Sequence, residues 1–124
     1  MKIRIVKKLI PHYYVDAEDW NQYYIDLVNK LNYFIQPIQW STEDKPHGYR
    51  IFLGENIKIP VYQIWYYDEF NSRSRIWNQY KWSEFHDRSF DDCVLTLDEA
   101  KDKAKECKIK YENRYGIIID EFNI

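Results

Sequence analysis

One stretch of the chain, residues 61–82, is dominated by aromatic and β-branched side chains on both sides of a polar centre. Asn71 and Ser72 occupy that centre. Antiparallel hairpins have this composition, because aromatic and β-branched side chains pack well on a pleated surface while Asn and Ser favour turns. The pattern predicts strands over residues 61–67 and 75–82, at the centre of a sheet.

Shorter strand patterns lie on both sides of this hairpin. Near the start of the chain, Ile3, Ile5 and Leu9 alternate with basic residues, which predicts a half-buried strand over residues 2–10. Residues 49–53 form another candidate strand, which ends at the turn signal of residues 54–56. The three adjacent isoleucines of residues 117–119 predict a last strand that is buried on both faces.

Two segments repeat apolar residues at the three- and four-residue spacing of an amphipathic helix. The first predicted helix covers residues 17–35, with Asp16 as its N-cap and Pro37 as its stop. The second covers residues 97–114 and begins with a capping box, in which Thr96 and Glu99 each bind a free backbone N–H group. We expect the core to contain residues of both helices and of the hairpin: Leu27, Leu31, Ile64, Ala100 and Ala104.

The element order β-α-β-β-β-α-β predicts the α+β class. The expected architecture is a two-layer sandwich, in which a mainly antiparallel sheet of about four to five strands packs against two helices. The chain has 124 residues, a length typical of one domain with one core. We therefore expect residues 1–124 to form a single globular α+β domain.

Charge and composition narrow the class of function. The 18 basic and 20 acidic residues give a net charge of −2, which argues against a polyanion binder that is held by bulk charge. Aromatic residues make up 19% of the chain, more than its core needs, so we expect some at the surface. The apolar runs are too short for a signal peptide or a membrane span, so we expect a cytoplasmic protein without a membrane partner. The abundance of Ile, Lys, Asn and Tyr in a small protein is typical of bacterial or phage accessory proteins.

The chain contains no recognisable catalytic, metal-binding or cofactor-binding motif. Cys93, Cys107 and the histidines share no short ligand spacing. A nucleophilic pair such as His86 with Cys93 would need a proximity that the sequence does not show. The acidic residues between positions 87 and 99 fit a solvated loop and the start of a helix. The sequence therefore predicts no cofactor and favours a non-enzymatic role.

The one candidate site combines basic and aromatic side chains on one face of a strand. Alternate residues of a strand share a face, and we expect the set that contains Ile76 to face the core. The other set of residues 75–81 is then exposed, beside Arg73 in the adjacent turn and Arg50 on a neighbouring strand. The predicted binding residues are Arg50, Arg73, Arg75, Trp77, Gln79 and Lys81.

These residue types fit two classes of partner. Trp and Arg are enriched at protein–protein hot spots, and the same side chains stack nucleobases and pair with phosphates. In a purely structural role, they would cover the second face of a small sheet through cross-strand pairs. Because the net charge is nearly neutral, we favour a non-enzymatic protein that contacts another protein through this face. Single-stranded nucleic acid or a nucleotide-type small molecule is the alternative ligand, and association with a second copy of the chain stays open.

Overall fold

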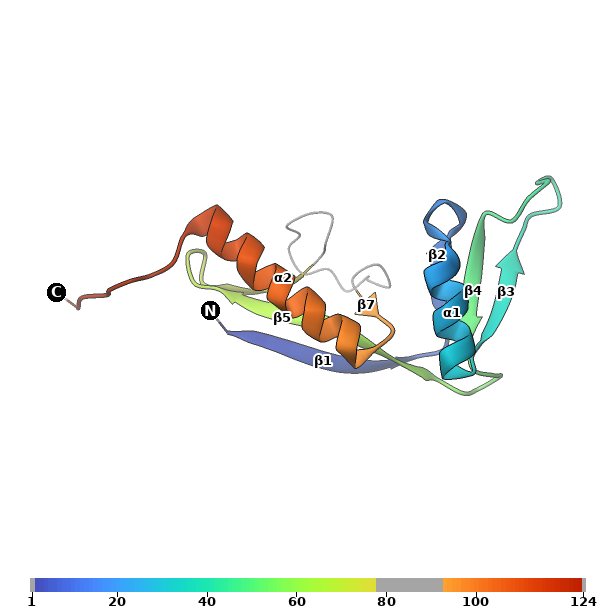
Figure 1. Ribbon diagram of the computed structural model, residues 1–124, viewed down its shortest axis with the longest axis horizontal. Helices are drawn as coiled ribbons and strands as arrows, with labels where there is room; N and C mark the ends of the chain where they lie inside the picture. Colours follow the sequence, from blue (N-terminus) through green and yellow to red (C-terminus); the bar gives the residue numbers. More distant parts are fainter. Residues whose placement is uncertain (1, 78–92, 124) are drawn as a thin grey trace. The chain divides into compact units, whose positions relative to one another are not determined.

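The computed structural model describes residues 2–77 and 93–123, which form two antiparallel sheets and two α-helices (Figure 1). The predicted α+β class is confirmed. The strands that the sequence assigns to one sheet divide between two. In chain order the elements are β1 (Ile3–Ile10), β2 (Tyr13–Asp16), the 3₁₀ helix η1 (Ala17–Asp19), α1 (Gln22–Leu31), β3 (Phe34–Ile38), β4 (Gly48–Phe52), β5 (Ile59–Asp68), β6 (Arg73–Ile76), β7 (Cys93–Val94) and α2 (Leu97–Tyr115).

The chain divides into two compact units. The first unit comprises residues 1–8 and 61–124, and the second comprises residues 9–60. The first contains α2 and most of the sheet with the order β1-β5-β6, in which β7 also pairs with β5. The second contains α1 and the sheet with the order β2-β4-β3. That residues 1–124 form a single domain stays a prediction.

In the first unit, β5 is the central strand. Neighbouring residues of a strand direct their backbone groups to opposite sides. The Tyr67 N–H donates to the Lys2 carbonyl beside β1 at 3.0 Å, whereas the Ile64 carbonyl accepts from the Trp77 N–H, beyond the end of β6, at 2.8 Å. Within the part of the chain that the structure describes, β1 therefore forms one edge of this sheet.

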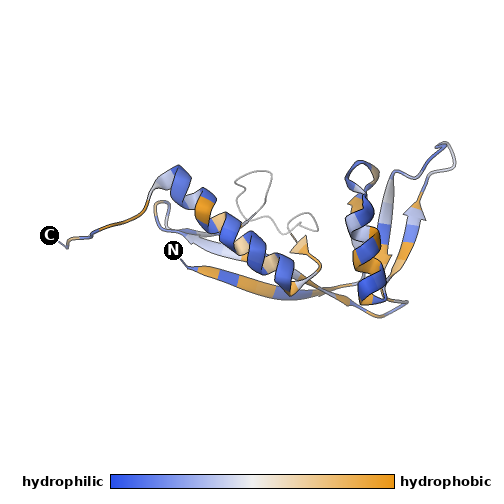
Figure 2. Ribbon diagram, viewed as in Figure 1, coloured by the Kyte–Doolittle hydropathy of each residue, from blue (hydrophilic) through white to orange (hydrophobic). Residues whose placement is uncertain are grey.

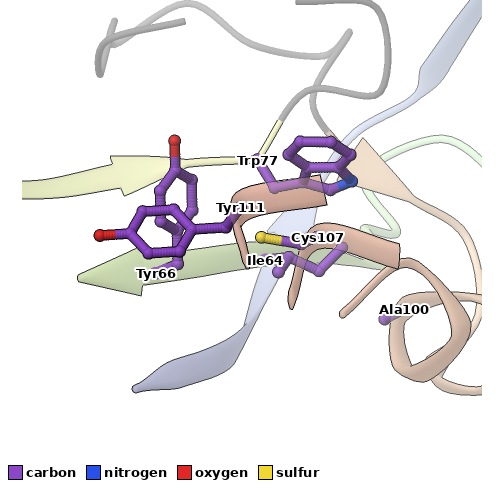
Figure 3. Close-up of a cluster of buried hydrophobic side chains, with 6 residues drawn as sticks. All are labelled: Ile64, Tyr66, Trp77, Ala100, Cys107 and Tyr111. Carbon is purple, nitrogen blue, oxygen red and sulfur yellow. The ribbon is translucent and has the colours of Figure 1, made fainter. Parts of the chain in front are cut away.

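Helix α2 packs on this sheet around a cluster of buried side chains (Figure 3). The predicted cap by Thr96 is confirmed, because its hydroxyl accepts a hydrogen bond from the Glu99 N–H at 3.2 Å. Ala104, a predicted core residue, is partly buried against the cluster. The cluster consists of Ile64, Tyr66, Trp77, Ala100, Cys107 and Tyr111.

In the second unit, one face of the sheet packs against α1. Ile51 on β4 is fully buried and lies opposite Tyr13 of β2 and Ile35 of β3 in the strand register. On the same face of β4, the ring of Tyr49 stacks on Trp20 with 4.3 Å between ring centroids. Trp20 also stacks on Tyr24 of α1. The odd-numbered residues of β4 thus face the helix, and the even-numbered residues face away from it.

The predicted first helix is too long at both ends. Asp16 makes no capping bond to η1, and Asn21 caps α1 instead, since its side-chain oxygen accepts from the Tyr23 N–H at 2.9 Å. The helix ends at Asn32, which has the left-handed conformation (φ 57°) that Asn tolerates. Phe34 therefore belongs to β3, whose edge position accommodates Pro37. Of the predicted core residues on α1, Leu27 is buried and Leu31 is partly exposed.

The strand predicted over residues 117–119 is also wrong. These residues follow α2 without strand pairing, and Ile117, Ile118 and Ile119 are 68%, 47% and 95% exposed. Burial of a strand on both faces requires sheet neighbours and covering layers. Within the described residues of this chain, the segment has neither.

Candidate binding surface

Arg75 and Trp77 share one face of their sheet, as the alternation predicts, but this face packs against α2. Trp77 is 4% exposed and belongs to the buried cluster (Figure 3). The Lys110 ammonium of α2 lies 5.5 Å from the centroid of its ring system. The prediction that Trp77 lies on an exposed face is therefore wrong. Ile76, which belongs to the set predicted to face the core, is buried as predicted and is 1% exposed.

A buried carboxylate explains how Arg75 can face the helix. The Arg75 Nε donates to Asp68 Oδ2 at 3.0 Å, and the Asp68 side chain is fully buried. The Asn71 side-chain amide donates to the same oxygen at 2.7 Å. Asp68 Oδ1 accepts from the Phe70 N–H, the Asn71 N–H and the Tyr111 hydroxyl, each at 3.1 Å. The described residues thus saturate this carboxylate with donors.

These hydrogen bonds keep Asp68 ionised. Burial alone raises the pKa of Asp68, but the hydrogen bonds from Asn71, Arg75 and Tyr111 outweigh it and hold the pKa below its ordinary value. The Glu69 N–H donates to the Tyr111 hydroxyl at 3.0 Å. The network therefore joins the turn between β5 and β6 to α2, which is a structural role.

Of the other predicted binding residues, the structure describes Arg73 and Arg50. Arg73 is exposed at the start of β6, opposite Asp68 in the register. Arg50 lies on β4, which pairs with β2 and β3 in the other sheet. Gln79 and Lys81 lie outside the described residues. Because Trp77 is buried, an exposed surface centred on this side chain is not present.

A different sheet face carries a combination of aromatic and basic side chains that are exposed or half-buried. This Arg50–Phe52 face, which we define as Phe34, Gln36, Arg50 and Phe52, lies on the side of the β2-β4-β3 sheet that points away from α1. The Arg50 guanidinium lies 4.8 Å from the centroid of the Phe52 ring. Phe34 pairs with Phe52 in the register, with 5.8 Å between their ring centroids, and is 57% exposed.

The charge of Arg50 is not neutralised within residues 2–77 and 93–123. No acidic side chain there forms an ion pair with it, and its Nε atom is buried without a hydrogen-bond partner. Burial, followed by the positive charge of Arg50, lowers the pKa of the nearby His12. The guanidinium is thus held over an aromatic ring, where a cation is attracted to the ring face, and it can still pair with an acceptor.

The sequence analysis missed Phe34 and Phe52 as surface residues. Phe34 was expected in the first helix, and Phe52 was expected in a strand without assignment to a face. The sequence signal for a strand at Phe34 is the alternation of Phe34, Gln36 and Ile38 around Pro37. This signal competes with the helical spacing of the residues before it.

Comparison with known proteins finds no matching family model, no matching curated protein and no matching solved structure. No helix in the described part of the chain is long and apolar enough to cross a membrane. The described residues also contain no group of three or more His, Cys, Asp and Glu side chains that could hold a metal ion. No relative therefore assigns a role to the Arg50–Phe52 face.

Proposed function

We propose that this chain is a non-enzymatic binding protein that contacts another protein through the Arg50–Phe52 face. The observation that carries the proposal is the pair of adjacent phenylalanine rings, one of them 57% exposed, beside the Arg50 guanidinium. Aromatic and Arg side chains are enriched among the residues that dominate protein–protein affinity. The proposal keeps Arg50 from the sequence prediction and replaces Trp77 by the two phenylalanines.

The chemistry of this face indicates what a partner presents. Apolar side chains of the partner would cover Phe34 and Phe52, and a carboxylate or carbonyl oxygen would accept hydrogen bonds from Arg50. Because the guanidinium is already ordered over the ring of Phe52, little side-chain entropy is lost on binding. Truncation of a hot-spot side chain of this kind costs about 2 kcal/mol, or roughly thirtyfold in affinity.

Single-stranded nucleic acid, or a nucleotide-type small molecule, is the second candidate ligand. Arg50, which has no acidic partner among the described residues, would pair with a phosphate, and the exposed ring of Phe34 would stack on a base. The net charge of −2 weighs against this ligand, since phosphate neutralisation supplies most nonspecific affinity for nucleic acids.

Affinity capture from a lysate of the source cells tests the proposal with three forms of the chain. They are the parent, the double variant Phe34→Ser with Arg50→Ser, and the control Tyr23→Ser. Tyr23 lies on α1 and is 45% exposed, so the control removes an exposed aromatic ring away from the Arg50–Phe52 face. We expect a protein that the parent and the control retain and the double variant loses. The purified partner should bind the double variant at least about thirtyfold more weakly.

A fluorescence anisotropy titration with a labelled single strand of ~20 nucleotides separates the second candidate. Binding that weakens with salt and disappears in Arg50→Ser, with no protein lost from the captured set, favours the nucleic-acid ligand. If the double variant retains the same proteins as the parent and the parent does not bind the strand, both proposals for this face are wrong.

A further inference from the structure

The segment that follows α2 combines exposed apolar side chains with acidic ones. Ile117, Ile118, Ile119 and Phe122 are 68%, 47%, 95% and 76% exposed, and Figure 2 shows hydrophobic colour over most of the segment. Asp120 and Glu121 interrupt this apolar run and are also exposed. β-Branched and aromatic residues favour strands, and such a concentration of exposed apolar side chains marks an interaction site. We call residues 117–122 the apolar extension.

Strand β1 offers a sheet edge of the opposite charge. Among the described strands β1 pairs only with β5, so the backbone groups along its other edge have no strand partner there. Arg4 and Lys7 are exposed, and strand alternation places them on opposite faces. Ile3 and Ile5 lie on the face that packs against the buried cluster. Basic residues on an edge discourage indiscriminate pairing, but they attract a strand that carries carboxylates.

We propose that the apolar extension of one copy of this chain adds as a strand to the β1 edge of a second copy. Addition of a strand to an open edge supplies main-chain hydrogen bonds, and alternate side chains supply specificity. Asp120 and Glu121 fall on opposite faces of an added strand, as Arg4 and Lys7 do on β1. Each face therefore receives one carboxylate and one cation. With Glu121 on the face of Lys7, Ile117 and Ile119 share the face of Ile3 and Ile5, which enlarges the apolar layer under α2.

The occupant of the edge is a second copy because of the direction in which the extension leaves its own unit. Gly116 ends α2 with φ 85° and ψ −175°, a backbone conformation that side chains other than Gly rarely adopt. From there the extension runs away from the sheet of its own unit (Figure 1). Each copy has one extension and one β1 edge, so a two-fold dimer fills both edges by reciprocal exchange.

Two charge-reversed variants test the exchange. The extension variant carries Asp120→Lys with Glu121→Lys, and the edge variant carries Arg4→Glu with Lys7→Glu. Sedimentation velocity from ~1 to ~200 µM chain, the range of weak and moderate protein association, should show a dimer for the parent. Each variant alone should dimerise roughly tenfold more weakly, because like charges then face each other across the strands.

Mixing the two variants distinguishes exchange between copies from a fold-back within one chain. In the mixture the lysines of one extension meet the glutamates of the other edge, and the remaining extension and edge keep their native charges. We therefore expect a heterodimer of parental affinity, and a chain that carries all four changes should dimerise with itself. Removal of residues 117–124 should abolish dimerisation. Thermal melts check that these exposed changes leave the fold intact.

Three outcomes overturn the inference. The first is a parent that stays monomeric throughout the concentration range, including a monomer whose extension amides are protected from hydrogen exchange by a fold-back. The second is a mixture of the two variants that associates no better than either variant alone. The third is a chain without residues 117–124 that dimerises like the parent, because another surface then carries the association.

Discussion

Replacement of Asp68 by Asn tests whether the buried carboxylate joins the β5–β6 turn to α2. The described residues donate three hydrogen bonds to Oδ1 and two to Oδ2. Asparagine keeps one oxygen, which can still accept the three hydrogen bonds that Oδ1 accepts in the parent. Its amide N–H₂ then faces the Arg75 Nε–H, which lies 3.0 Å from Oδ2 in the parent. The Asn71 amide can rotate to present its oxygen instead. Arg75 cannot, because a guanidinium has no acceptor.

The expected cost follows from this loss of one partner in a buried pair. Removal of one member of a buried ion pair costs about 3–5 kcal/mol. The Arg75 side chain is 13% exposed, so some hydration remains and we expect a value near the lower end, about 3 kcal/mol. That is a large share of a total stability of about 5–15 kcal/mol. The matched variant Tyr111→Phe keeps the ring and loses the hydroxyl, which should cost only about 1–2 kcal/mol.

Urea unfolding, followed by tryptophan fluorescence, measures the free energy of unfolding of both variants. At neutral pH the free energy of unfolding should fall in the order parent, Tyr111→Phe, Asp68→Asn. The folded pKa of Asp68 lies below its ordinary value, so its contribution is complete above the unfolded pKa of about 4 and is lost as the pH falls through the folded pKa. Stability should therefore decline below pH ~4 less steeply in Asp68→Asn than in the parent. If Asp68→Asn unfolds within about 0.5 kcal/mol of the parent at neutral pH, the carboxylate does not hold the turn and the helix together.

Three further predictions concern the first unit. Thr96→Ala removes the hydroxyl that caps α2 and should lower the stability measured in thermal melts by about 1 kcal/mol, whereas Thr96→Ser should melt close to the parent. An unchanged melt of Thr96→Ala would show that the cap is not formed. Trp77→Ala should cost about 3–5 kcal/mol, because the side chain is 4% exposed, and a fully folded variant of parental stability would restore the exposed-face interpretation. Burial raises the pKa of the Cys107 thiol to about 12. In a Cys93→Ser background, iodoacetamide should therefore label Cys107 slowly at pH 8 until urea unfolds the chain. Rapid labelling of the folded chain would contradict the burial of Cys107.

Local signals predicted α2 well. Thr96 and Gly116 each bind a backbone group only a few residues away in the sequence. The helix observed over Leu97–Tyr115 therefore differs by one residue from the prediction over 97–114. The first helix was overestimated because apolar spacing continues through Phe34 and Ile35, while the left-handed Asn32 that ends the helix carries no comparable pattern. Helical and strand periodicities overlap at such a boundary.

The face of β6 could not be chosen from its own residues. Alternation correctly placed Arg75 and Trp77 together, but the charge of Arg75 argued for the solvent side. The residue that reverses this argument is Asp68, which lies on the neighbouring strand β5 and comes within 3.0 Å only after the hairpin forms. Hydrogen bonds from Phe70 and Asn71 in the turn, and from Tyr111 on α2, offset the remaining cost of burying the Asp68 carboxylate. Because Tyr111 is 43 residues away from Asp68 in the sequence, the residues of β6 alone do not indicate that this charge can be buried.

The high aromatic content has different consequences in the two units. In the first unit Tyr66, Tyr111 and Tyr115 contact one another or the turn between β5 and β6, so these rings contribute to the fold. In the second unit Trp20, Tyr24 and Tyr49 stack on the side of α1. A three-stranded sheet with a single helix has only one face that the helix can cover. The rings of Phe34 and Phe52 lie on the other face, where truncation removes little packing against α1. Changes on this face should therefore separate binding from stability, whereas changes at Trp77 should not.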